Sequence, residues 1–135
     1  MHCRSLFYVL GSLFVFTFAG VTAEAHHSVA GMYDTSQETR ISGVVVQFQF
    51  VHPHPLVVVD TQRDGTTERW TLEMDNRGEL AHIGFSDSTL KPGDQVSVRG
   101  SLARREPRRL YIMRLDRKAD GFAYEQIGSR PQIVK

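Results

Sequence analysis

Histidine is the residue type in this sequence whose placement points most directly to chemistry. Four of the six histidines fall into two close pairs, His26 with His27 and His52 with His54. Imidazole nitrogen suits copper, zinc and nickel, and Cu(II) heads the affinity order of the divalent first-row metals. The two pairs therefore predict a transition-metal site with Cu(II) as the preferred ion.

The second pair lies in the segment His52-Pro53-His54-Pro55. A residue that precedes proline is restricted to extended conformations, so both histidines belong to a stiff, extended segment. Alternate side chains of such a segment share one face, about 6–7 Å apart along the backbone. The pair can hold one metal ion or contribute to a site completed from elsewhere. The alternative interpretation is a proline-stiffened connection with exposed histidines.

The first pair gains significance from a predicted cleavage site. Arg4, an apolar run over residues 6–21 and the exit Ala23-Glu24-Ala25 are the three parts of a secretory signal. The run of about 16 residues is shorter than the roughly 20 that span a bilayer, which argues against the alternative of a permanent anchor. We expect a periplasmic or secreted protein without a transmembrane segment after cleavage, and Cys3 leaves with the signal.

Cleavage after Ala25 makes His26 the first residue of the mature chain. Its free amine, with an ordinary pKa of about 7.7–8.0, and its imidazole then form a chelate for Cu(II). With His27 in second position, an amine–amide–imidazole chelate is a competing arrangement. The alternatives are a solvated His-His tip, or cleavage after Ala23, which removes the terminal histidine.

The mature chain has the size and charge of one ordinary domain. Removing 25 of the 135 residues leaves 110, without cysteine, so neither disulfides nor thiolate ligands are available. Removing Arg4 and Glu24 from the 16 basic and 15 acidic residues leaves 15 and 14, and this balance gives no indication of nucleic-acid binding. We divide the chain into a signal (1–25), a flexible His-rich segment (26–38), one barrel domain (39–128) and a tail (129–135).

Apolar and polar residues alternate from Thr39 onward, which indicates half-buried strands. The predicted inner face of the first strand comprises Val44, Val46, Phe48 and Phe50. The strand over residues 69–74 is expected to place Trp70, Leu72 and Met74 inward, with Thr71 and Glu73 outward. Core packing is the simpler role for Trp70 and Met74, with Cu(I) binding as the alternative.

Other patterns complete the predicted order of elements. Residues 56–59 form a β-branched run that ends at the hairpin signal Asp64-Gly65. A short helix over residues 77–83 begins at the cap Asn76 and carries His82, which we interpret as structural or exposed. Two further strands and a short sixth piece, residues 122–127, follow. This order predicts an all-β fold with one short helix, a five- to six-stranded antiparallel OB-fold-like barrel; a small β-sandwich is the main alternative.

A cluster of arginines lies between the last two barrel strands. Residues 104–109 carry Arg104, Arg105, Arg108 and Arg109. In OB folds this loop often contacts ligands, and four arginines suit an acidic envelope partner or anionic lipid headgroups. The alternative is a solvated, salt-bridged hairpin.

Several short motifs together resemble a known family. They are Ala25-His26-His27-Ser28, Tyr33-Asp34, Gly43-x-Val45, Pro53-His54, Trp70-x-x-Glu73, Leu90-x-Pro92-Gly93-Asp94-x-Val96 and Asp120-Gly121. Over nearly the whole mature chain these resemble small exported bacterial proteins grouped as domain of unknown function 6152. That family usually has Asn-Pro-His where this chain has His52-Pro53-His54. The resemblance implies an exported barrel-like domain and no established activity.

Three hypotheses about function follow from these observations. The first is a non-enzymatic metal-binding or metal-sensing domain that uses His26, His52 and His54, with His27 as the alternate ligand. The second is an envelope adaptor that binds an acidic partner through the arginine-rich residues 104–109, which we call the arginine tip. The third is a copper oxygenase with an N-terminal histidine brace, for which the small domain leaves little substrate surface. A weaker similarity to periplasmic copper-chaperone barrels concerns architecture alone, because their Met-x-Met spacing is missing.

Overall fold

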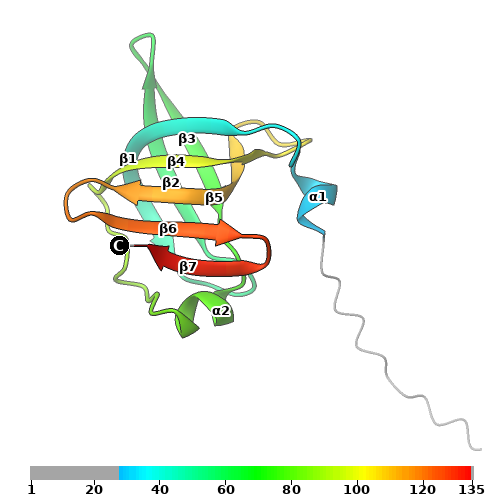
Figure 1. Cartoon of the computed structure of the whole chain (residues 1–135). Helices are drawn as coiled ribbons and strands as arrows, with labels where there is room; N and C mark the ends of the chain where they lie inside the picture. The colour runs from blue at the N-terminus through cyan, green and yellow to red at the C-terminus, as the bar shows by residue number, and fades with distance from the viewer. Residues whose placement is uncertain (1–27, 135) are drawn as a thin grey trace, which may run out of the picture.

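The computed structural model describes residues 28–134, which form seven strands and two short helices (Figure 1). Because the predicted signal, Cys3, His26 and His27 precede Ser28, the predictions made for them lie outside the described residues. The elements in chain order are α1 (Val29–Met32), β1 (Thr39–Gln49), β2 (Leu56–Arg63), β3 (Thr66–Glu73), α2 (Arg77–His82), β4 (Gln95–Leu102), β5 (Arg109–Arg117), β6 (Phe122–Ile127) and β7 (Arg130–Val134).

Five of the strands close into a barrel. β1 pairs with β2 and β4, β2 with β3, and β4 with β5, all antiparallel. A short parallel pairing of Thr71–Glu73 with Arg109–Tyr111 then joins β3 to β5 and closes the wall. β6 and β7 extend the sheet beyond β5. The prediction of an all-β, OB-fold-like barrel is confirmed. The barrel was predicted to be antiparallel, whereas the pairing of β3 with β5 that closes it is parallel.

α2 lies at one end of the barrel, between β3 and β4 in the chain (Figure 1). The Asn76 side chain accepts a hydrogen bond from the Gly78 amide at 2.7 Å, as expected of a helix cap. Leu80 is fully buried and adds to the core at this end. The described part of the chain holds no helix with the length and apolar character of a membrane span.

The first strand faces the core in a different phase from the predicted one. Val45 is 1% exposed, whereas Val44 is 41% exposed, so the prediction that Val44 points inward is wrong. A β-bulge between Val45 and Gln47 leaves Val46 without a partner on β2. The extra residue shifts the alternation and returns Phe48 to the core side, where it packs against the buried cluster.

Both ends of the described chain are more ordered than predicted. Tyr33, within the segment expected to be flexible, is 1% exposed and forms a β-bridge with Ala103. Residues 130–134, within the predicted tail, form β7, which pairs with β6 along its length. Ile133 packs against the core, and this burial gives the strand a reason to form.

The close contact of Gly43 with β2 and the exposure of Val44 give a testable prediction. A Cβ at Gly43 would overlap the carbonyl oxygen of Asp60 and lie 2.7 Å from Val59 Cγ1. Gly43→Ala is therefore expected to lower the free energy of unfolding by about 1–3 kcal/mol, the usual cost of overpacking. Val44→Thr, at the exposed neighbour, should change it by less than about 0.5 kcal/mol. Urea unfolding measures both, and a larger loss for Val44→Thr would place Val44 in the core.

Candidate functional site

The histidine pair of the β1–β2 connection, residues 50–55, lies against the segment that leads into α2. The Met74 amide donates to the Pro55 carbonyl at 2.9 Å, and the Arg77 amide donates to the Pro53 carbonyl at 3.0 Å. Two prolines restrict the connection from within, and these bonds fix it from outside. The backbone that carries both histidines is therefore held in one place.

His54 is half-buried and has its ring orientation set by a backbone group. Its Nδ1 lies 3.2 Å from the Met74 carbonyl oxygen, which can only accept, so Nδ1 carries the proton in this contact. The tautomer leaves a lone pair on Nε2, which has no hydrogen-bond partner among residues 28–134. Histidines that bind metal ions commonly have this arrangement, with one ring nitrogen donating to a carbonyl and the other free.

His52 has a different environment. It is exposed, and its Nε2 lies 3.3 Å from Arg77 Nη1. Arg77 is itself fixed, because its Nε donates to the Phe50 carbonyl at 2.9 Å and its guanidinium lies 4.5 Å from the centre of the Phe50 ring. A guanidinium can only donate, so it occupies the Nε2 lone pair and places a positive charge beside it. The two histidines therefore share a connection but not an environment, and His54 is the better-prepared candidate ligand.

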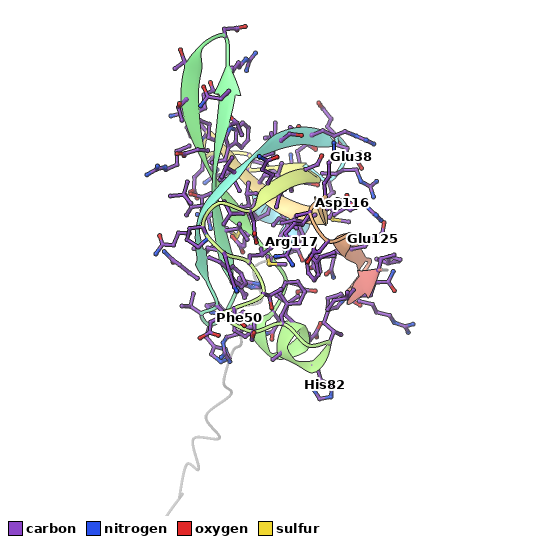
Figure 2. All side chains as sticks on the ribbon, turned by 90° about the vertical axis from the view of Figure 1, so that its left-hand side faces the viewer. Glu38, Phe50, His82, Asp116, Arg117 and Glu125 are labelled. Atoms are coloured by element: carbon purple, nitrogen blue, oxygen red, sulfur yellow. The ribbon has the colours of Figure 1, made fainter. Side chains whose placement is uncertain are left out.

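The remaining histidine in the described chain is remote from this connection. Figure 2 shows His82 pointing away from the molecule below α2, in agreement with its exposure. Within residues 28–134 the structure brings together no group of three or more histidine, cysteine, aspartate and glutamate side chains that would hold a metal ion. A complete site around His54 thus needs ligands from another source.

A buried polar cluster that the sequence patterns did not reveal centres on Glu73, the residue before Met74. Tyr33 Oη donates to Glu73 Oε2 at 2.5 Å, and Arg109 Nη2 donates to the same oxygen at 2.6 Å. Arg109 Nε also donates to Tyr33 Oη at 3.1 Å. Glu73 lies on the strand face opposite the core residue Leu72, as predicted, yet it is only 8% exposed. Its side chain is covered because residues 28–38, which we call the N-terminal arm, carry Tyr33 over it.

The electrostatics of this cluster favour a neutral tyrosine and a charged arginine. Burial, together with the hydrogen bond to Glu73, raises the pKa of the Tyr33 hydroxyl above its ordinary value. The hydrogen bond to Glu73 is also the main reason why the pKa of Arg109 is raised. Arg109 therefore remains a permanent cation whose charge is offset locally by Glu73 and by Glu106, which is 2.8 Å from Nη1.

The four arginines of the β4–β5 tip divide into two kinds. Arg109 belongs to the buried cluster, and Arg104 donates to the Ala30 carbonyl at 3.2 Å and lies 3.7 Å from Asp34. These two hold the N-terminal arm in place. Arg105 and Arg108 are exposed and have no ion-pair partner within the described residues. Two of the four predicted partner-binding side chains are thus available on the surface.

The cluster and His54 are anchored to adjacent residues. Glu73, the last residue of β3, binds Tyr33, and Met74, which follows it, binds His54. The motifs Tyr33-Asp34 and Trp70-x-x-Glu73 contained the signal, but a pairing over 40 positions is not visible in local periodicity. The structure thereby places the start of the described chain and the β1–β2 connection against the same strand end.

The buried tyrosines predict a loss of stability at alkaline pH. Burial is the main cause that raises the pKa values of Tyr33, Tyr111 and Tyr124. An unfolded tyrosine ionises near pH 10, so each contribution is complete below pH 10 and is lost as the pH rises above it, by about 1.4 kcal/mol per pH unit. Urea unfolding of the parent and Tyr33→Phe between about pH 8 and pH 11 should show a shallower decline for the variant. Identical slopes would mean that Tyr33 ionises freely in the folded protein.

Comparison with known proteins leads to one family. A family model described as "Family of unknown function (DUF6152)" matches residues 15–109, and the chain belongs to this family. The matched part runs from the predicted signal through β4 to the first residue of β5, so it includes the histidine pairs and the arginine tip. No curated protein matches the sequence.

Proposed function

From membership in this family of unknown function, we propose that the chain is an exported, non-enzymatic β-barrel protein that binds one Cu(II) ion. His54 is the anchoring ligand, and the protein works in the periplasm or outside the cell. The signal-like N-terminus supports the location, and the two histidine pairs support the ion.

The observation that carries the proposal is the state of the His54 ring. Its Nδ1 hydrogen bond to the Met74 carbonyl selects the tautomer whose Nε2 lone pair is free. Because the connection is held by the Met74 and Arg77 amides, the ring needs little reorganisation to bind an ion. A preset tautomer and a fixed backbone are the features that make a ligand ready before the metal arrives.

The other ligands in this proposal come from the mature N-terminus. The amine and imidazole of His26 supply two nitrogens, with His27 as the alternate imidazole. Tyr33 is fixed on Glu73, one residue from the His54 anchor, and it lies only seven positions after His26. A chain extends at most about 3.3–3.6 Å per residue, which is ample for this separation. His52 becomes an additional ligand only if Arg77 moves away from its Nε2.

A specific observation favours a second candidate function, binding of an anionic partner. Arg105 and Arg108 are exposed at the β4–β5 tip without ion-pair partners in the described chain, whereas most arginines of the barrel are paired. Two unpaired guanidinium groups on one loop suit carboxylate or phosphate groups. This function is compatible with metal binding because it uses other residues.

The copper proposal predicts a selective effect of one histidine. His54→Ala should lower the affinity for Cu(II) by at least about tenfold, because loss of a ligand costs no less than loss of its hydrogen-bond partner. His82→Ala is the matched control, since His82 is exposed and remote, and should bind like the parent. One extra residue before His26 should weaken binding independently. Calorimetry on the mature protein measures all three, and an unchanged affinity for His54→Ala would contradict the proposal.

The anionic-partner candidate predicts a loss of binding confined to the tip. The double variant Arg105→Ala/Arg108→Ala should lose about 2 kcal/mol of binding to phosphatidylglycerol vesicles, roughly thirtyfold. Lys91→Ala/Arg130→Ala removes the same charge from other exposed positions and should have a smaller effect. Vesicle co-sedimentation at low and high salt measures this. Equal losses in the two double variants would show attraction by net charge alone.

A further inference from the structure

The barrel wall is open between β1 and β2, at the end opposite to His54. β1 pairs with β4 from Thr39 onward, but it pairs with β2 only from Val44. β2 continues to pair with β3 as far as Arg63, although its pairing with β1 stops at Asp60. Beyond the close approach of Gly43 to the Asp60 carbonyl, residues 39–42 and residues 61–63 therefore diverge with neither edge paired across the gap, and we call this gap the slot. In Figure 1 the β2–β3 hairpin projects beyond the barrel while β1 turns away toward α1.

The slot passes through the sheet. One cleft, of about 570 Å³, lies on the outer face and is lined by Asp60, Thr67, Gln95 and Ser97 among others. Another, of about 440 Å³, opens on the barrel side and is lined by Ile41, Trp70 and Leu102 among others. Ser42 and Gln62 belong to both linings, so the two clefts meet between the diverging strands. Most residues of both linings are polar, and the barrel side is distinguished by the apolar group Ile41, Trp70 and Leu102.

The barrel-side lining of the slot contains an unsatisfied donor. Trp70 Nε1 is buried and has no hydrogen-bond partner, and it is the only such side-chain atom in the described residues. Buried polar groups in folded proteins nearly always have a partner, and leaving one unpaired costs free energy. An acceptor supplied by a bound molecule would satisfy this indole N–H.

The geometry points to a binding site for an extended polypeptide segment, and we propose that such a segment inserts into the slot as an additional strand. Unpaired strand edges are templates for strand addition, because their N–H and C=O groups are presented in a row. Here two edges face one gap, so an inserted segment gains main-chain hydrogen bonds from β1, β2 or both. Carbonyl groups of that segment also supply the acceptor that Trp70 lacks.

The two faces of the slot specify the side chains of the segment. Successive residues of a strand point to opposite faces, so a bound segment places alternate side chains on the Trp70 side and on the Ser97 side. Apolar side chains of the segment can pack on Ile41, Trp70 and Leu102, and polar ones can bond to Thr67, Gln95 and Ser97. We therefore expect an alternating apolar and polar sequence. Arg63, Glu68 and Lys118 in the two linings have no ion-pair partner within residues 28–134, so the ends of the segment can carry a charge of either sign. This site is independent of the proposed copper site.

Selection of a randomised heptapeptide display library on the mature protein tests the proposal. Enriched peptides should alternate apolar and polar residues, and a synthetic copy should shift the fluorescence of Trp70, the only tryptophan in the sequence. N-methylation of alternate peptide amides removes strand hydrogen bonds and should abolish binding to the unaltered protein. Failure to enrich such peptides, or equal binding of the N-methylated copy, would overturn the proposal.

Two variants locate the binding. Trp70→Phe keeps an aromatic ring and removes the N–H, so calorimetry should show about five- to tenfold weaker binding of the synthetic peptide. Ile127→Thr, at an exposed residue of β6, should bind it like the parent. Equal affinities for Trp70→Phe and the parent would overturn the assignment of the indole donor. Dimers that form without peptide and dissociate when it is added would identify a second copy of the chain as the occupant and overturn the partner proposed.

Discussion

The contact between Arg109 and Glu73 is the interaction on which the arrangement of this barrel depends. It lies at the seam where β3 and β5 pair in parallel over three residues each, and without that pairing β3 is an unpaired edge. In an isolated buried ion pair, the attraction between the charges is often smaller than the free-energy cost of removing them from water. Here Glu73 Oε2 accepts hydrogen bonds from both Arg109 and Tyr33. The N-terminal arm covers this seam, so closure of the barrel and docking of the arm are supported by the same few hydrogen bonds.

The seam also determines where the side chains of the candidate site lie. Glu73 and Met74 are consecutive, and they bind Tyr33 from the arm and His54 from the β1–β2 connection. A strand end held on both sides is a rigid support, which a ligand-binding side chain needs more than a flexible loop. The copper proposal uses this support twice, once to orient the imidazole of His54 and once to bring the start of the chain toward it.

Sequence patterns predicted the barrel because turns, alternation and the capped helix are local signals. The bulge after Val45 was not predictable in this way, since three successive valines satisfy either phase of the strand. The burial of Glu73 and Tyr33 depends on a contact across 40 positions, and β7 depends on packing of Ile133 rather than on its own short, proline-containing sequence. For the candidate site, the sequence identified His54 and its neighbours, whereas the Arg77 charge that separates His52 from it required three-dimensional structure.

The open slot persists in the fold because each of its edges is held from behind. The first half of β1 pairs with β4, and a chain of ion pairs continues from Glu38 through Arg99 to Glu125 on β6. Figure 2 shows Glu38, Asp116 and Glu125 on the same side of the barrel. On the other edge, Arg69 of β3 donates two hydrogen bonds to Asp60 of β2, and this contact lowers the pKa of the Asp60 carboxyl. Exposed ion pairs of this kind contribute little individually, so the strand pairings provide most of the restraint. Residues 39–42 of β1 follow β4 and residues 61–63 of β2 follow β3, so these pairings hold the two free edges apart, and an added strand fills the slot without breaking either pairing.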